Sequence, residues 1–233
     1  MTWKKRGKES REKADIVVSN ISPAQTCALA NLPYQETKQT ANSLLSVYLG
    51  FSKNLKSVYG KQAYSRFFFP GVKTIDDYKA LLERDITERG FVFVDYSQID
   101  AGLCSPDKSV ASICTTDFIA PYLEMTEDEY KQKKQDIIDA FLKVLEEHYP
   151  GIGDLVEYSE AGTPRTMQRY LRTPEGTAYG FAPSAEQFFR KPQVKSPLLN
   201  NLYFTGAWVI GGGFSPAISS GNMCYKAIER VRR

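Results

Sequence analysis

The chain closes with a short strand, a glycine-rich turn and a helix. Residues 202–205, LYFT, have the composition of a strand, and GAWVIGGGFSPAISSG (206–221) follows directly. Glycines before a helix let a phosphate approach the free N–H groups and the positive dipole end of the first helical turn. We expect Ser215 to be the N-cap and Pro216 to be the first helical residue. A tight turn before a packed helix explains the spacing equally well, so the turn alone is weak evidence of a ligand.

The glycines match neither of two common nucleotide-binding signatures. No Gly-Lys-Ser/Thr follows them, which excludes a Walker loop, and their spacing differs from that of the dinucleotide fingerprint GxGxxG. The fingerprint GxGxxG occurs nowhere in the 233 residues. The sequence therefore contains one candidate phosphate-binding turn without a second one to accompany it.

The rest of the chain is predicted to be rich in strands. The run Ile16–Val18 is short, continuous and apolar, which favours a strand buried on both faces. A long helix is expected after Thr126, which forms a capping box with Glu129 and precedes apolar residues at helical spacing as far as Pro150. Further strands are expected at 43–51, 64–70, 91–99, 109–115 and 155–158, and shorter helices at 75–84 and after Pro164.

The order of these elements suggests two domains. A strand near the start and the strand–turn–helix unit at 202–221 resemble two parts of one domain, and the sheet-rich sequence between them resembles an insertion. We expect residues 1–23 and 195–233 to form the first domain and residues 24–194 to form the second. The fold class is predicted to be mixed α/β.

The composition is that of an ordinary soluble globular protein, with 42% hydrophobic and 24% charged residues. A net charge of +3 is too small to indicate nucleic-acid binding, and the basic run near the start alternates with acidic residues, as in a solvated hairpin or frayed end. No segment resembles a signal peptide or a membrane span, so we expect a cytoplasmic protein and leave peripheral membrane contact open. No metal site is expected, because the cysteines lack metal-binding spacing and resemble free thiols: Cys27, Cys104, Cys114 and Cys224.

Three stretches carry a resemblance to a known group of proteins. NLYFTGAWVIGGGFSPAISSGNMCYKAI (201–228) resembles the C-terminal signature of phytoene desaturases, carotenoid isomerases and retinol saturases. ADIVVSNISP (14–23) and GTPRTMQRYLRTPEGTAYG (162–180) resemble two further segments of that group in order and spacing. These phytoene dehydrogenase-like proteins are FAD-dependent oxidoreductases within the amine-oxidase-like flavoprotein superfamily. The resemblance implies a doubly wound FAD-binding domain with an inserted substrate domain built from a mixed sheet and helices.

The resemblance also implies which residues lie near the flavin. In the group, the strand and glycine turn bring the ribityl and pyrophosphate part of FAD against the last helix. Many members carry an acidic residue after the first glycine, whereas this chain has Ala207 and so lacks that polar anchor. The positions carried over to this sequence as cofactor-binding are Gly206, Ala207, Trp208, Gly212, Gly213, Phe214, Ser215, Pro216 and Ala217.

The missing fingerprint sets an expectation about the whole protein. In the group, GxGxxG on the first strand receives the adenosine diphosphate half of FAD. We therefore expect this chain to be the C-terminal portion of such a flavoenzyme, to bind FAD weakly or not at all alone, and to self-associate through exposed sheet edges. The alternative is a non-catalytic module, derived from such an enzyme, that binds an apolar ligand or a partner protein.

Substrate and catalytic residues are less constrained. The resemblance implies an apolar isoprenoid or polyene substrate, and the run Phe67, Phe68 and Phe69 is a candidate lining for an apolar tunnel, although ordinary core packing is the alternative. Nothing identifies a catalytic acid or base, and His148, the only histidine, is expected to be exposed at a helix end. A last feature is the near-helical spacing of Arg165, Arg169 and Arg172, which predicts an exposed basic edge or, alternatively, an anion-binding one.

Overall fold

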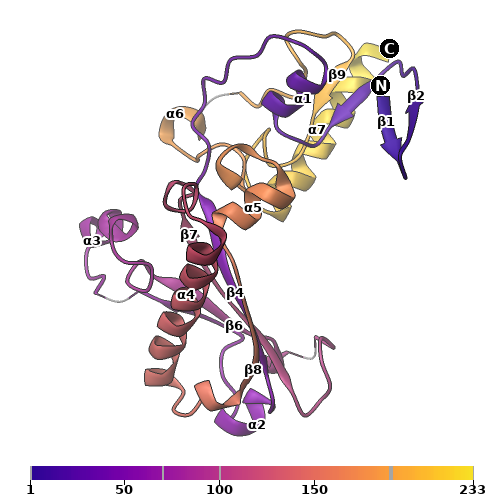
Figure 1. Cartoon of the computed structure of the whole chain (residues 1–233). Helices are drawn as coiled ribbons and strands as arrows, with labels where there is room; N and C mark the ends of the chain where they lie inside the picture. The colour runs from indigo at the N-terminus through magenta and orange to yellow at the C-terminus, as the bar shows by residue number, and fades with distance from the viewer. Residues whose placement is uncertain (1, 70, 100, 189–190, 233) are drawn as a thin grey trace. The chain divides into compact units, whose positions relative to one another are not determined.

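A computed structural model describes residues 2–69, 71–99, 101–188 and 191–232 of the chain (Figure 1). The fold is mixed α/β, as expected, with parallel and antiparallel sheets. The chain divides into two compact units: unit 1 comprises Met1–Ala41 and Ala178–Arg233, and unit 2 comprises Asn42–Thr177. The discontinuous arrangement resembles the expected one, but the boundaries lie at 41/42 and 177/178 rather than at 23/24 and 194/195. The reason is that the backbones of Ala41 and Gly180 are hydrogen-bonded to each other, which keeps both segments in unit 1.

Unit 2 is built on a five-stranded antiparallel sheet with the strand order β5–β6–β7–β4–β8. The longest strands, β4 and β7, pair along their whole length, from Ser43 opposite Asp117 to Phe51 opposite Ser109. The two strands β6 and β7 alternate between buried residues and more exposed ones, as expected for a sheet with one face on the core. Their bounds are β4 Ser43–Phe51, β5 Ser65–Phe68, β6 Phe91–Asp95, β7 Ser109–Asp117 and β8 Val156–Gly162.

The long helix α4, Glu127–His148, covers one face of this sheet (Figure 1). It begins with the predicted capping box: the Thr126 side chain accepts from the Glu129 N–H, and the Glu129 carboxylate accepts from the Thr126 N–H. The helix buries Ile137, Ile138, Phe141 and Leu145 against the sheet residues Leu45, Val47, Leu49, Phe93 and Ile113. His148 is exposed at the last position of α4, as predicted.

Shorter helices complete unit 2. The helix expected at 75–84 is split into α3, Ile75–Lys79, and the 3-10 turn η1, Ala80–Glu83. Helix α2 spans Leu55–Tyr59. Helix α5, Pro164–Leu171, has Thr163 as its N-cap, and Pro164 occupies the first turn, where its missing N–H costs nothing.

Unit 1 contains a two-stranded parallel sheet, in which β3, Val17–Ser19, pairs with β9, Leu202–Phe204. The side chain of Val18 is 49% exposed, so the expected burial of this strand on both faces is wrong. The basic run near the start forms an antiparallel hairpin, which is one of the two forms expected for it. The strands of this hairpin are β1, Thr2–Lys5, and β2, Lys8–Arg11. Helix α1 spans Pro23–Leu29, α6 spans Ala185–Phe188, and α7 spans Phe214–Arg232.

The last helix begins earlier than predicted. The N–H of Ala217 bonds to the carbonyl of Gly213 at 3.2 Å, so helical bonding starts at Gly213 and α7 begins at Phe214. Ser215 and Pro216 therefore lie inside the first turn, and Ser215 is not the N-cap. Glycine at 213 adopts φ +99°, which lets the chain enter the helix without a side-chain cap.

All four cysteine thiols are free, as predicted. Within the part of the chain that the structure describes, no helix is both long enough and apolar enough to cross a bilayer.

Glu146, near the end of α4, gives a pH-dependent prediction. Its carboxylate accepts hydrogen bonds from the N–H groups of Gly151 and Gly153, which hold the pKa of Glu146 below its usual value. This stabilisation is present above the unfolded-state pKa of roughly 4.3 and is lost as the pH falls through the lower folded-state pKa. We expect Glu146→Gln to lower the free energy of unfolding in urea at pH 7, with the difference from wild type shrinking below about pH 4.

The control is Glu147→Gln, because the neighbouring Glu147 side chain is exposed. If the free energy of unfolding differed between wild type and Glu146→Gln by the same amount at neutral and acid pH, the stabilising role of the Glu146 carboxylate would be contradicted.

Candidate functional site

The glycine turn starts where β9 ends. The N–H of Thr205 donates to the carbonyl of Ser19 at 2.9 Å, which extends the parallel pairing by one residue beyond β9. The next residue, Gly206, has φ +85°, and its N–H donates to Oγ of Ser220 at 2.7 Å. Ser220 is fully buried in α7 and donates in turn to the carbonyl of Ala217 at 2.6 Å. One hydroxyl therefore fixes the start of the turn to the second turn of the helix.

No side chain fits at Gly206. A Cβ there would lie 1.9 Å from Oδ1 of Asn20, the residue that follows β3. The carboxyl ends of β3 and β9 therefore lie side by side, with α1 leaving one of them and the glycine turn leaving the other. In open parallel α/β sheets, ligands bind outside the carboxyl ends of the strands.

A second segment of unit 1 packs against the turn. Gly180, at φ +75°, faces the backbone of Ala207, whose carbonyl oxygen would lie 2.3 Å from an added Cβ. A Cβ on Gly212 would lie 2.1 Å from Cδ1 of Tyr179. The Tyr-Gly pair that ends the stretch 162–180 thus contacts both ends of the turn, which explains why glycine is required at 180 and 212.

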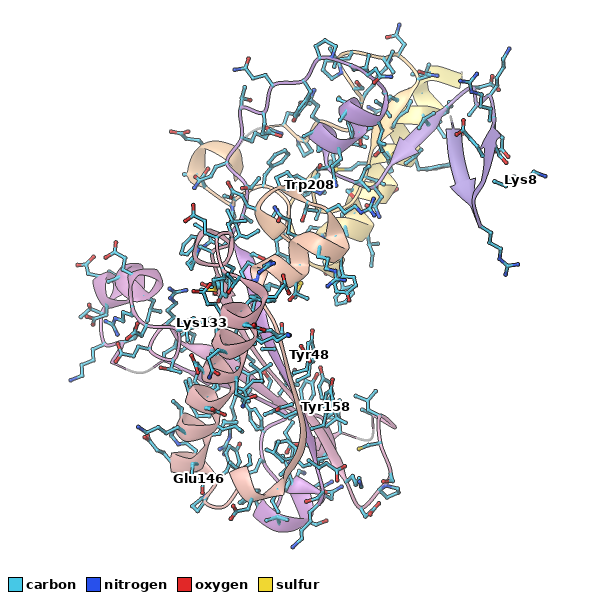
Figure 2. The ribbon with its side chains drawn as sticks, in the orientation of Figure 1. Lys8, Tyr48, Lys133, Glu146, Tyr158 and Trp208 are labelled. Atoms are coloured by element: carbon cyan, nitrogen blue, oxygen red, sulfur yellow. The ribbon has the colours of Figure 1, made fainter. Side chains whose placement is uncertain are left out.

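Trp208 points into the protein (Figure 2). It is buried and packs edge-on against Phe181, with ring centroids 5.0 Å apart. Both rings line a cavity of about 270 Å³, to which α1 and residues 33–38 also contribute. Burial and a hydrogen bond to Glu36 raise the pKa of Tyr34 in this cavity, and burial raises the pKa of the Cys27 thiol. Both groups are therefore protonated at neutral pH, and the cavity holds no reactive thiolate.

The start of α7, in contrast, is open to solvent. Gly213, Phe214 and Ser215 are exposed, and the Phe214 side chain is 91% exposed. The first N–H bonded within the helix belongs to Ala217, so those of Phe214 and Ser215 have no intrahelical acceptor. Two backbone donors, a helix dipole and the exposed Gly213 thus meet at one accessible point, an arrangement that suits an anion.

Unit 1 also presents an unpaired strand edge. The outer edge of β9 is covered, because Phe204 N–H bonds to the carbonyl of Val194 and Ser196 N–H bonds to that of Leu202. Val17 and Ser19 direct their backbone groups toward β9, so those of Val18 point to the opposite edge of β3. Among the described residues, none pairs with that edge.

Helix α7 has an apolar face that unit 1 leaves uncovered. Phe214, Ile218 and Tyr225 recur at helical spacing and are 91%, 74% and 63% exposed, with Gly221 between them. A stripe of this kind, together with an open parallel edge, is unusual for the surface of an independent domain.

Comparison with known proteins finds similar sequences in two kinds of enzyme. No protein-family model matches the chain. The all-trans-retinol 13,14-reductase of Danio rerio is 27% identical over 208 residues, which cover 82% of this chain and 34% of that protein. The chloroplastic prolycopene isomerase of Arabidopsis thaliana is 30% identical over 154 residues, which cover 64% of this chain and 25% of that protein. The chain is a relative of the retinol reductases and prolycopene isomerases.

This relationship confirms the resemblance drawn from the three stretches. The chain spans about a third or less of the length of these relatives. An oxidoreductase from Methanosarcina mazei gives a structural match over 95% of this chain and 44% of its own, with 14% identity and a TM-score of 0.48.

The nine residues expected near a flavin divide into three sets by exposure. Gly206 and Trp208 are buried, and Gly213, Phe214 and Ser215 are exposed. The other four are half-buried: Ala207, Gly212, Pro216 and Ala217. The sequence reasoning did not anticipate Ser220, although a serine one turn into a helix that follows a strand and glycine was visible. It also did not anticipate the contacts of Tyr179.

The three phenylalanines do not form one surface. Phe67 and Phe69 stack on each other with centroids 6.2 Å apart and are 66% and 48% exposed. Phe68 points the other way and stacks on Phe91 in the core of unit 2. This follows from the alternation of side chains along a strand, and none of the three lines the cavity at Trp208. Their role in substrate binding stays a prediction.

The contact between Gly180 and the turn is testable. Gly180→Ala would place a Cβ against backbone atoms in a left-handed conformation, so we expect unit 1 to lose about 2–4 kcal/mol of stability. The measurement is urea unfolding followed by the fluorescence of the two tryptophans of the chain, Trp3 and the buried Trp208, both of which belong to unit 1.

Gly7→Ala is the matched control, because Gly7 has φ +81° but no atom within 4 Å of an added Cβ. It is expected to show the cost of the backbone conformation alone, about 1–2 kcal/mol or less. Equal losses for both variants would show that the close approach to Ala207 contributes nothing.

Proposed function

We propose that the chain is part of an FAD-dependent oxidoreductase that acts on an apolar isoprenoid or polyene. The observation that carries the proposal is the turn Gly211–Ser215 at the start of α7, whose residues 213–215 are exposed, after the carboxyl end of one of two parallel strands. The relationship to retinol reductases and prolycopene isomerases supports it.

The described residues fit one part of FAD. The first turn of α7 offers the N–H groups of Phe214 and Ser215 to a phosphate oxygen, and glycine at the exposed position 213 keeps the approach free of a side chain. Ala207 offers no carboxylate for a ribityl hydroxyl, so backbone amides would provide the contacts. When bound, the flavin would supply hydride or electron transfer, and the role of these residues is to hold and orient it.

The other part of the site would come from additional polypeptide. The free edge of β3 and the apolar stripe Phe214, Ile218 and Tyr225 are surfaces that a dinucleotide-binding segment with a parallel strand could cover. Covering them would complete the sheet and enclose the turn. Without that segment, the same surfaces would favour self-association of the chain.

A non-catalytic module that binds an apolar ligand or a partner protein is the second candidate. Two features favour it: Ala207 stands where a polar anchor is common, and Phe67 and Phe69 are exposed side by side. Flavin binding distinguishes the candidates, because such a module has no need of the anion site at α7.

The test is reconstitution with flavin. We expect the chain alone to remain colourless after FAD is added and desalted away. Co-expressed with the part of the Danio rerio reductase outside the matched region, it should form a yellow complex with flavin absorbance. Ser215→Asp, which adds a negative charge in the first turn of α7, should weaken FAD binding by about ten-fold or more.

Ser219→Asp is the matched control, because Ser219 is also exposed on α7 but lies one turn further along. It should change FAD affinity much less. Tight stoichiometric binding by the chain alone would contradict the shared site, and a colourless complex would contradict the oxidoreductase function and favour the module.

A further inference from the structure

The side chain of Asn20, directly after β3, covers the glycine that starts the turn. A Cβ added to Gly206 would lie 1.9 Å from Oδ1 of Asn20 and 3.1 Å from its Cγ. Asn20 is nevertheless exposed, and none of the described residues forms a hydrogen bond with its carboxamide. The carboxamide therefore keeps an acceptor oxygen and two N–H donors for a ligand or for water.

The backbone on both sides of Asn20 is fixed. The carbonyl of Ser19 accepts from the N–H of Thr205 at 2.9 Å, which ties the end of β3 to the end of β9. Two residues further on, the buried Ser22 is the N-cap of α1, and its hydroxyl accepts from the N–H of Gln25 at 3.1 Å. A side chain carried between two fixed residues has less conformational freedom to lose when a ligand binds.

The other side-chain oxygens at this end of the two strands are engaged inside unit 1. Oγ of the buried Ser19 lies 2.6 Å from Oγ1 of Thr26. Oγ1 of Thr205 lies 3.1 Å from Oγ of the fully buried Ser220. Within the part of the chain that the structure describes, Asn20 is therefore the exposed side-chain acceptor that remains where β3 and β9 end.

The hydroxyl groups of a flavin cofactor require acceptors as well as donors. The main-chain N–H groups of the turn can donate to a hydroxyl oxygen, but they cannot accept the hydroxyl proton. In the related group, an acidic residue after the first glycine is a suitable acceptor, whereas this chain has Ala207. Oδ1 of Asn20 lies against Gly206, one residue before that position.

We propose that Asn20 is a specificity-determining residue of the flavin site, and that its Oδ1 accepts a hydrogen bond from a hydroxyl of the cofactor. It takes the role of the carboxylate that is absent at position 207. The carboxamide is neutral, so this contact places no negative charge near the phosphate that the first turn of α7 would hold. The inference rests on the proposed function, because it names a further contact of that same site.

The test compares FAD affinities in the complex of the full 233-residue chain with the co-expressed part of the Danio rerio reductase. Asn20→Leu removes the acceptor at nearly unchanged size and should weaken FAD binding about ten-fold. Asn20→Asp keeps an acceptor on a side chain of the same shape, so it should bind FAD several-fold more tightly than Asn20→Leu. Binding is followed by the quenching of flavin fluorescence and does not depend on catalysis.

A second variant supplies the acceptor from the neighbouring position. Ala207→Asp, made in the Asn20→Leu background, should restore most of the lost FAD affinity. The same substitution in the wild type should change the affinity much less, because Asn20 already accepts the hydrogen bond. If Asn20 only packed against Gly206, a carboxylate at position 207 would not compensate for its loss.

Asn200→Leu is the matched control, because Asn200 is also exposed but precedes the amino end of β9. It should leave FAD affinity unchanged. Equal affinities of wild type and Asn20→Leu would overturn the inference and leave the proposed function standing, as would an Asn20→Asp variant that binds no better than Asn20→Leu. A wild-type complex that assembles and stays colourless would overturn both.

Discussion

The parallel pairing of β3 with β9 is the constraint on which unit 1 depends. It joins residues 17–19 to residues 202–204, so it closes a loop of more than 180 residues with three residues in each strand. So short a pairing is weak by itself, since isolated two-stranded sheets are marginal in water. It holds because side chains and backbone around it are also fixed: Thr205 bonds back to Ser19, and Val194 and Ser196 cover the outer edge of β9.

The same pairing gives the glycine turn its position. Once the ends of β3 and β9 lie side by side, Asn20 occupies the space where a side chain at position 206 would project. The chain can leave β9 only with a glycine of positive φ, and Ser220 then accepts the freed N–H of that glycine. Gly206 and Ser220 therefore depend on each other, although 14 positions separate them in the sequence.

Many helices and strands of the fold could be predicted from residue patterns, and the exceptions have physical causes. The capping box at Thr126 and the strand at 43–51 depend on local chemistry and alternation, which the sequence shows directly. The start of α7 was predicted two residues late, because Ser215 and Pro216 fit an N-cap in any context, whereas the actual first bond uses the carbonyl of Gly213. The exposure of Val18 could not be predicted, since it depends on what lies beside β3 and not on the residues of β3.

The sequence did not show how the residues of the candidate site divide between buried and exposed positions. Nine consecutive or near-consecutive positions were expected to contact one ligand, yet a strand-to-helix turn cannot expose every residue. Packing against Tyr179 and Gly180 requires one side of the turn to be buried, which is where Trp208 lies. The buried residues fix the backbone, and Gly213, Phe214 and Ser215 are left exposed. An anion site built from main-chain donors needs this division, because amides held by their own packing pay little further entropy on binding. The absence of an acidic side chain at position 207 is compatible with such a site, since the recognition rests on the backbone rather than on a single anchor.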